Sequence, residues 1–251
     1  MSSVFSLLDE KLQKELKKRS WQPTPIQEAA IPQIIAGNDR LLIAPTGSGK
    51  TLSAILPVIN RCLVEQWGPL SILYVTPLRA LNRDVDRRLQ EIGESVGLRV
   101  GLRHGDTTQS ERAKQVRKPP DILITTPETF QLMFTGKNLR ELLKTVKAII
   151  IDEVHDLAAS ERGWQLSLGL SRLEALSGNK VQRIGLSATV GNPQQVAKWL
   201  SSEGEAIIET GKRVTEIVVE TAFPETIDET GGIEYAIPAR AHAIFRDIIE
   251  I

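Results

Sequence analysis

The sequence predicts an open α/β fold in which a mostly parallel β-sheet carries helices on both faces. Short aliphatic runs recur along the chain without alternating apolar and polar residues, so both faces of each run are expected to be buried, as in a parallel sheet. Segments with helix signals separate these runs, and repeated strand–helix units produce this architecture. The predicted strands are Arg40–Ala44, Ser71–Thr76, Arg99–His104, Asp121–Thr125, Ala148–Asp152 and Val181–Ser187.

We predict helices from residues that are typical of helix ends and from the spacing of apolar residues. Thr24 can cap a helix that has Pro25 in its first turn and Gly37 just past its end. Leu78–Ile92 and Gln165–Leu176 carry apolar residues three and four positions apart, which is the spacing of one helix face. These segments are long enough to connect parallel strands.

The pattern changes after about residue 201. Ala206–Glu209 and Val214–Thr221 are predicted strands, and the acidic, turn-rich stretch Phe223–Gly232 is typical of a linker. A helical pattern resumes over Ala236–Ile251. The expected divisions are a first domain over residues 1–210, a linker or crossover strand over 211–235, and the start of a truncated second domain over 236–251.

Composition limits the classes of protein to which the chain can belong. Hydrophobic residues make up 41% of it, enough for a sizeable core. Lys+Arg and Asp+Glu each number 31, yet nucleic-acid binding depends on local charge. Ten basic and six acidic residues lie between Thr76 and Lys118, an excess that by itself is more typical of a solvated face.

The single cysteine and the lack of long apolar runs exclude several further classes. Cys62 can form neither a disulfide within the chain nor a zinc cluster. Met1–Val4 do not begin a signal peptide, and no apolar run is long enough to cross a membrane. The cytoplasm is the expected compartment, with association with the nucleoid in a prokaryote.

A glycine-rich stretch between a predicted strand and a predicted helix has the pattern of a phosphate-binding loop. Its backbone N–H groups can surround an anion at the N-terminus of the helix. Lys50 would reach the β- and γ-phosphates, and the Thr51 hydroxyl would bind Mg²⁺. The alternative is a surface turn with a solvated lysine. The loop consists of Ala44, Pro45, Thr46, Gly47, Ser48, Gly49, Lys50 and Thr51.

An acidic pair follows the most aliphatic predicted strand. Asp152 and Glu153 come directly after Ala148–Ile151, at the carboxyl end of the strand, where open α/β sheets bind their ligands. Asp152 would hold Mg²⁺, directly or through water, and Glu153 would act as the general base on the attacking water. Alternatively, the pair caps the next helix.

The order of these motifs resembles that of the superfamily 2 helicases, with their RecA-like P-loop NTPase domain. The fourth letter of motif II is His155, which, with the strings T-P-L-R-A-L and S-A-T-V-G-N, is most similar to the large helicase-related (Lhr) and Ski-type helicases. The matching segments are Pro23–Gln27 (Q motif), the phosphate loop (motif I), Thr76–Leu81 (motif Ia), Thr126–Glu128 (motif Ib), Asp152–His155 (motif II) and Ser187–Thr189 (motif III).

The resemblance implies a role for each motif. Gln27 would read the adenine of ATP, and Phe5 or Trp21 is a candidate to stack on it. The partner would be single-stranded or partly duplex nucleic acid, DNA more than RNA, and a second RecA-like domain would complete the ATP site with its arginines. The implied contacts to the phosphate backbone are Thr76, Arg79, Gly105 and Thr126, and the residues implied to couple the two sites are His155, Ser187 and Thr189.

The sequence has two kinds of alternative function, another phosphate-loop enzyme or a protein that binds nucleotide without unwinding nucleic acid. Leu176–Lys180 starts like a transporter ATPase signature and then departs from it, and Asn179–Gln182 lacks the aspartate of a GTPase motif. A nucleotide-gated clamp or annealing scaffold that does not unwind is the principal alternative, although a pure binder would not need Glu153. The chain alone is expected to be weakly active, unless self-association supplies Arg183 or Arg213 in trans. DNA or RNA preference, polarity of unwinding, pathway and oligomeric state do not follow from these motifs.

Overall fold

The computed structural model describes residues 3–77, 83–158 and 160–208, without the side chains of residues 83–85. The chain divides into two compact units, Met1–Gly211 and Lys212–Ile251, and the second lies outside the described residues. The predicted strand Val214–Thr221, the linker and the start of a second domain therefore also lie outside them. The helices and strands of the described residues all belong to the first unit.

The predicted α/β fold is confirmed. In the described residues, parallel strands form one seven-stranded sheet in the order β3-β4-β2-β5-β6-β1-β7. Each predicted strand within this part of the chain is present, with ends shifted by a residue or so. The strands are β1 (Arg40–Ile43), β2 (Ile72–Val75), β3 (Val100–Arg103), β4 (Ile122–Thr125), β5 (Ala148–Ile151), β6 (Gln182–Ser187) and β7 (Glu205–Ile208).

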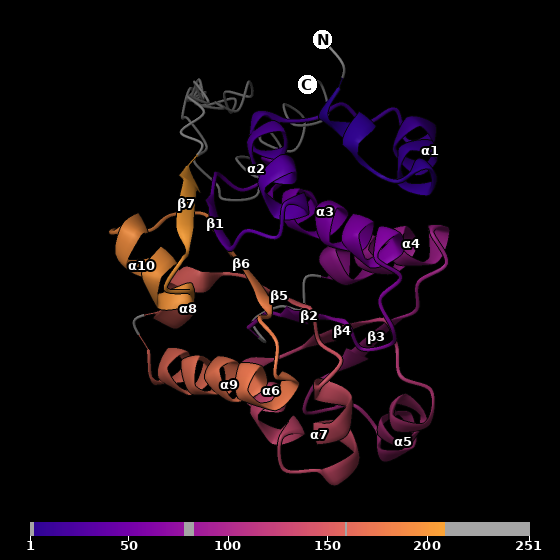
Figure 1. The fold of residues 1–251 in the computed structure, drawn as a ribbon, viewed down its shortest axis with the longest axis vertical. Helices are drawn as coiled ribbons and strands as arrows, with labels where there is room; N and C mark the ends of the chain where they lie inside the picture. The colour runs from indigo at the N-terminus through magenta and orange to yellow at the C-terminus, as the bar shows by residue number, and fades with distance from the viewer. Residues whose placement is uncertain (1–2, 78–82, 159, 209–251) are drawn as a thin grey trace, which may run out of the picture. The chain divides into compact units, whose positions relative to one another are not determined.

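Helices cover both faces of this sheet (Figure 1). On one face lie η1 (Val4–Leu7), α1 (Glu10–Lys18), α2 (Pro25–Ile35), α3 (Lys50–Val64) and α4 (Arg83–Ser95). On the other lie α6 (Pro127–Met133), α7 (Lys137–Leu143), α8 (Val154–Ala158), α9 (Glu161–Ser177) and α10 (Pro193–Leu200). The remaining helix of the described part, α5 (Gln109–Arg117), buries none of its side chains.

The core consists of two layers, one on each face of the sheet. Leu42 and Ile150 face the layer beneath α2 and α3, whereas Leu41 and Ile149 face the layer beneath α9 and α10. Alternate residues of one strand thus enter different layers, and both must be apolar. This explains why β5 and most of β1 are aliphatic runs.

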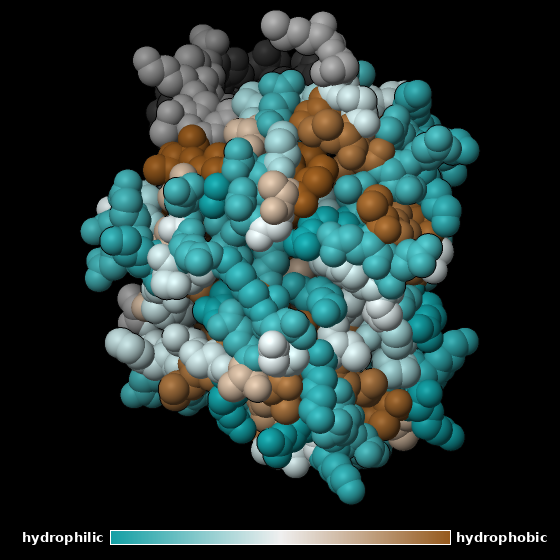
Figure 2. Space-filling model, in the orientation of Figure 1, coloured by the Kyte–Doolittle hydropathy of each residue, from teal (hydrophilic) through white to brown (hydrophobic). Residues whose placement is uncertain are grey.

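The outer surface is mainly polar. On the face shown in Figure 2, hydrophilic residues predominate and hydrophobic residues gather in small, separate patches. None of the helices in the described ranges is long and apolar enough to span a membrane.

Candidate functional site

The predicted site residues gather at the carboxyl edge of the sheet. In β1, Ile43 is in register with Ser187 of the neighbouring β6, and Ile151 of β5 is in register with Gly185 on the other side of β6. The segments that follow β1, β6 and β5 therefore leave the sheet side by side. These segments are the glycine-rich loop, the Ser187 segment and the acidic pair.

Two glycines give the loop its shape. Gly47 and Gly49 have φ angles of 75° and 93°, a region that residues with a Cβ rarely adopt. Gly49 is the N-cap of α3, and a Cβ there would lie 2.6 Å from Nε2 of Gln27. The Ser48 hydroxyl is buried and has no hydrogen-bond partner among the described residues, so a polar site in the loop is open to an anionic ligand.

Lys50, the first residue of α3, folds back over this loop. Its ammonium group donates hydrogen bonds to the carbonyl oxygens of Ala44 and, at 2.9 Å, of Pro45. Burial lowers the pKa of Lys50, and the carboxylates of Glu153 and Asp152 oppose that effect. The cation is thus held between the loop and the acidic pair.

Tyr74 of β2 holds the buried carboxylate of Asp152. Its hydroxyl donates to Oδ2 of Asp152 at 2.5 Å, and the backbone N–H of Glu153 donates to Oδ1 at 2.9 Å. Burial raises the pKa of Asp152, whereas the bond from Tyr74 and the charge of Lys50 lower it. Burial also raises the pKa of Tyr74 well above its usual range, so the phenol keeps its proton and donates.

The side chains of Thr51 and Asp152, whose oxygens are expected to hold Mg²⁺, both interact with Tyr74. Besides bonding to Asp152, the Tyr74 hydroxyl interacts with the side chain of Thr51. Sequence reasoning missed Tyr74; the available signal was one phenol in an otherwise aliphatic strand. Among the described residues no group of three His, Cys, Asp or Glu side chains could hold a metal by itself. A nucleotide-bound Mg²⁺ fits Thr51 and Asp152, because this ion needs only one or two protein ligands beside phosphates and water.

Glu153 has an unusual backbone conformation and a carboxylate oxygen that has no hydrogen-bond donor among the described residues. Its φ is 49°, in the left-handed region. Burial, followed by the charge of Asp152, raises the pKa of Glu153. Its Oε2 atom is buried and accepts no hydrogen bond from the part of the chain that the structure describes, although Nδ1 of His155 lies 3.4 Å away. A carboxylate in this state can accept a proton.

His155 connects the acidic pair to the end of β6. Its Nδ1 lies 3.1 Å from Oγ of Ser187, and that hydroxyl donates to the backbone carbonyl of Thr189 at 2.9 Å. Because the Ser187 proton is used in the second bond, Nδ1 of His155 must carry the proton of the first. Thr189 takes part through its carbonyl oxygen, and its side chain is exposed.

Gln27 joins helix α2 to the loop. Its Oε1 accepts from the backbone N–H of Thr24 at 3.1 Å, and its Nε2 donates to the carbonyl of Gly49 at 3.4 Å. Neither candidate for stacking on adenine offers a free ring. Phe5 is buried in the core, and Trp21 packs against the core with the guanidinium of Arg19 5.2 Å from its ring centre.

Three of the predicted nucleic-acid contacts follow neighbouring strands. Gly105, Thr126 and Thr76 come after β3, β4 and β2, which are adjacent in the sheet. Thr126 is buried and caps α6, accepting from the backbone N–H of Thr129 at 3.3 Å. Gly105 is exposed. The fourth, Arg79, lies outside the described residues.

An arginine that sequence reasoning missed shapes the loop at Gly105. Arg112 of α5 donates to the carbonyl oxygens of Thr107, His104 and Gly105 at 2.9, 3.0 and 2.9 Å. His104 is structural in this loop, accepting at Nδ1 from the backbone N–H of Asp106 at 3.2 Å. No periodicity marks Arg112, because α5 lies on the surface.

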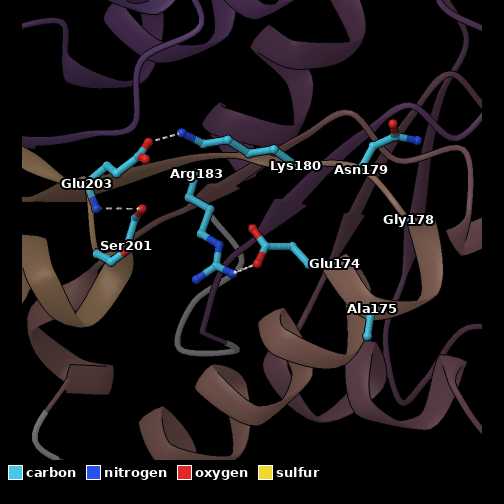
Figure 3. Close-up of a pocket in the computed structure, with 9 residues that line it drawn as sticks. Glu174, Ala175, Gly178, Asn179, Lys180, Arg183, Ser201 and Glu203 are labelled. Carbon is cyan, nitrogen blue, oxygen red and sulfur yellow. Dashed lines mark hydrogen bonds and ion pairs between the residues drawn. The ribbon is translucent and has the colours of Figure 1, made fainter.

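A pocket of about 480 Å³ lies at the opposite, amino edge of the sheet (Figure 3). Its charged groups bind one another: Arg183 pairs with Glu174 at 2.8 Å, and Lys180 pairs with Glu203. Arg183 also donates to the carbonyl of Leu200 at 2.9 Å. To act in trans at the phosphates of a second copy, Arg183 would have to give up these bonds, and that expectation stays a prediction. Arg213 lies outside the described residues.

Comparison with known proteins gives consistent matches. The family model described as DEAD/DEAH box helicase matches residues 24–196. The chain is 45% identical over 201 residues to the Lhr helicase/probable uracil glycosylase of Mycolicibacterium smegmatis, a match that covers 74% of this chain and 13% of that protein. It is 39% identical over 248 residues to the ATP-dependent helicase Lhr-Core of Methanothermobacter thermautotrophicus, covering 90% and 28%.

Solved structures give similar matches. The structure of Mycobacterium smegmatis helicase Lhr bound to ssDNA and AMP-PNP superposes with a TM-score of 0.73 at 37% identity, covering 99% of this chain and 33% of that one. The DUF1998 helicase MrfA bound to DNA and AMPPNP also gives 0.73, at 26% identity, covering 83% and 30%. The chain thus spans about a third or less of each of these four proteins.

Proposed function

This chain belongs to the DEAD/DEAH box helicase family, has the RecA-like fold of its helicase domains, and is closely related to the Lhr helicases. From this membership we propose that it is the ATP-binding motor domain of a nucleic-acid-dependent helicase. The convergence of Lys50, Asp152 and Glu153 at one edge of the sheet carries the proposal. DNA is favoured as the partner, because the Lhr and MrfA structures that resemble this chain are bound to DNA.

In this proposal the loop residues 44–51 enclose the phosphates of ATP. Lys50 exchanges its bonds to the Ala44 and Pro45 carbonyls for bonds to the β- and γ-phosphates. Thr51 and Asp152 hold Mg²⁺, which when bound neutralises charge on the phosphates. Glu153 accepts the proton of the attacking water, for which its raised pKa and its unbonded oxygen are suited.

Adenine recognition by Gln27 requires a rearrangement. Both polar atoms of its amide already have partners, Thr24 on one side and Gly49 on the other. We propose that Gln27 shares these bonds with adenine and thereby reports base binding to the phosphate loop. Equal affinity for GTP and ATP would contradict this role.

The nucleic-acid strand is proposed to run across the ends of β3, β4 and β2. Thr76, Gly105 and Thr126, with Arg79, would contact its phosphates through backbone and side-chain groups, which position a strand without reading its sequence. His155 lies beside Glu153 and is bonded to Ser187, which in turn bonds to the Thr189 carbonyl. We propose that this series of contacts transmits the state of the nucleotide to the strand.

The domain arrangement and the cellular location are also proposals. A first domain over residues 1–210 would be followed by a crossover over 211–235 and a second RecA-like domain from 236, and the two domains would enclose ATP together. The protein would act in the cytoplasm, at the nucleoid in a prokaryote.

The test is ATP hydrolysis by the complete protein, measured with and without single-stranded DNA or RNA. Lys50→Ala should abolish hydrolysis and nucleotide binding, whereas Lys180→Ala, which removes a lysine at the opposite edge, should leave both unchanged. A strand-displacement assay separates a helicase from a nucleotide-gated clamp, which would bind ATP and nucleic acid without unwinding. Normal ATP turnover by Lys50→Ala would refute the assigned site.

A further inference from the structure

Arg103, the last residue of β3, carries a buried charge that has no counterion in the described part of the chain. Its exposed fraction is 7%. Its guanidinium donates to Oε1 of Gln115 at 3.0 Å, and no carboxylate of the described residues forms an ion pair with it. The buried carboxylate of Asp39 differs, because the ammonium group of Lys180 lies 3.8 Å from it. A buried charge is unfavourable unless it is paired, so an anionic partner is expected for Arg103.

A second arginine adds positive charge at the same place. Arg112 bonds only to backbone carbonyl oxygens in the loop 104–107, which do not neutralise its charge. Burial, followed by the charge of Arg112, lowers the pKa of Arg103. The carboxylate of the loop itself, that of Asp106, is 89% exposed beside His104. Two like charges are thus held near each other, and neither pairs with a carboxylate of the residues that the structure describes.

A buried hydroxyl without a partner lies opposite Arg103. Arg103 of β3 is in register with Thr125 of β4, and residues in register on neighbouring parallel strands point to the same face of the sheet. Thr125 is 1% exposed, and its Oγ1 atom has no hydrogen-bond partner within the described ranges. An under-satisfied cation and an unsatisfied hydroxyl therefore share one point of the sheet.

This point lies between two of the proposed phosphate contacts. Gly105 follows Arg103 by two residues and is exposed, and Thr126 directly follows Thr125. The buried charge thus lies at the base of the loop that is proposed to meet the strand. Water screens a buried charge much less than an exposed one, so Arg103 can attract an anion at the surface of the loop.

We propose that Arg103 and Arg112 form an anion site beneath the loop 104–107, and that this site holds one backbone phosphate of the bound strand at Gly105. This inference rests on the proposed function. Gly105 contacts the phosphate, and Arg103 acts through the loop as a positioning residue that supplies charge. The unpaired cation destabilises the free protein, and the phosphate offsets this effect when the strand binds.

A carboxylate from another part of the complete protein is the competing partner for Arg103. The phosphate is favoured because proposed strand contacts follow both residues of the pair, Gly105 after Arg103 and Thr126 after Thr125. The two partners also predict opposite effects on stability. A carboxylate would already pair with Arg103 in the free protein, whereas a phosphate pairs with it only when a strand is bound.

The test replaces Arg103 with an uncharged side chain of similar length. In the complete protein, Arg103→Met should leave the thermal unfolding midpoint unchanged or raise it, because an unpaired buried cation is lost. The same variant should bind a fluorescent oligo-dT strand about tenfold more weakly at low salt, as expected for one lost ionic interaction. The slope of log Kd against log salt concentration should decrease by about one.

Two further variants isolate the effect of the charge. Arg103→Lys keeps the charge and should retain most of the strand affinity and the salt slope. Arg99→Met is the matched control, because Arg99 directly precedes β3 at the opposite edge of the sheet and pairs with Asp121 at 3.3 Å. This control should bind the strand as wild type does.

Each outcome supports or overturns the proposal. Equal strand affinity and salt slope for wild type and Arg103→Met would overturn the anion site and leave the proposed function in place. Failure of the wild-type protein to bind any strand at low salt would overturn both. A clear fall in the unfolding midpoint of Arg103→Met would mean that the charge is already paired in the free protein, so the partner would be a carboxylate and the proposal wrong.

Discussion

At the residue scale, Asp152 and Glu153 are neighbours in sequence but have different surroundings. Asp152 receives hydrogen bonds from Tyr74 and from the backbone, whereas the buried Oε2 atom of Glu153 receives none from residues 3–77, 83–158 and 160–208. A carboxylate held by donors is suited to bind a cation, and one without donors is suited to take a proton. The site therefore separates two chemical roles between adjacent residues.

Replacing Glu153 tests the second role. Glu153→Gln keeps the shape of the side chain and removes the base, so ATP binding should persist while hydrolysis by the complete protein falls about 100- to 10,000-fold. Glu203→Gln, at the opposite edge of the sheet, is the control. Because burial and Asp152 raise the pKa of Glu153, wild-type activity should fall on acidification at a higher pH than for an ordinary glutamate. ATP turnover by Glu153→Gln within threefold of wild type would show that Glu153 is not the general base.

Tyr74→Phe tests the support of Asp152. The change leaves a buried carboxylate oxygen without its donor, which should destabilise the fold by about 1–3 kcal/mol. It should also raise the Mg²⁺ concentration needed for half-maximal ATP hydrolysis, because Asp152 loses the bond that holds it and opposes the effect of burial on its pKa. Denaturant unfolding and a Mg²⁺ titration measure the two effects. If neither changes, the short bond from Tyr74 has no part in the site.

The proposed coupling of the ATP site to the nucleic-acid strand predicts different effects for substitutions of Ser187 and Thr189, two residues of the same motif. The Ser187 hydroxyl bonds to both His155 and the Thr189 carbonyl, whereas Thr189 supplies only its backbone. Ser187→Ala should therefore keep most ATP hydrolysis and reduce unwinding, and Thr189→Ala should change neither. Sequence reasoning treated both hydroxyls alike. A proportional fall of both activities in Ser187→Ala would show that the serine belongs to the ATP site itself.

At the scale of elements, the strands could be predicted because each must be apolar on both faces. The glycines and Lys50 of the loop were predictable because their pattern follows from backbone geometry. Several helices were not predicted; among them, α5 buries no side chain and so has no apolar period, and α7 is short. Tyr74 was missed because its partner, Asp152, lies on another strand, and only the order of the strands brings them together.

The junction of α8 and α9 depends on a glycine. A Cβ at Gly163 would lie 1.9 Å from the Leu157 carbonyl oxygen, a backbone atom that cannot move without shifting α8. Gly163→Ala should therefore destabilise the domain by about 1–3 kcal/mol in denaturant unfolding. Gly68→Ala is the control, because no atom lies within 4 Å of the Cβ it would add. Equal free energies of unfolding for the two variants would mean that α8 and α9 can move apart without destabilising the domain.

At the scale of the whole molecule, the two edges of the sheet have different chemistry. The amino edge has charges that neutralise one another, such as Arg183 with Glu174. The carboxyl edge has a lysine and two carboxylates with raised pKa values. Within the described residues, the carboxyl edge therefore offers charged groups suited to ligands, as expected where strands of an open α/β sheet end.

The last prediction is that residues 1–251 alone hydrolyse ATP slowly and do not unwind a duplex. Within the described residues, Lys50 is the cation held beside the acidic pair, and Arg183 is bound at the other edge. In related phosphoryl-transfer enzymes, an arginine that stabilises charge on the transferred group contributes about 10³- to 10⁵-fold in rate. The family resemblance assigns such arginines to a second RecA-like domain, and the chain spans 13–28% of the first four curated relatives it matches.

A steady-state ATPase assay with and without single-stranded DNA or RNA checks this expectation. Hydrolysis should be slow and nearly independent of nucleic acid, because one domain forms only part of the strand-binding surface. Any weak strand binding should fade as salt rises, since phosphate contacts release counterions. Robust stimulation by either nucleic acid would instead mean that the active site is completed within residues 1–251 or by a second copy of the chain. Sedimentation of the active sample distinguishes these two cases, because only the second requires a dimer.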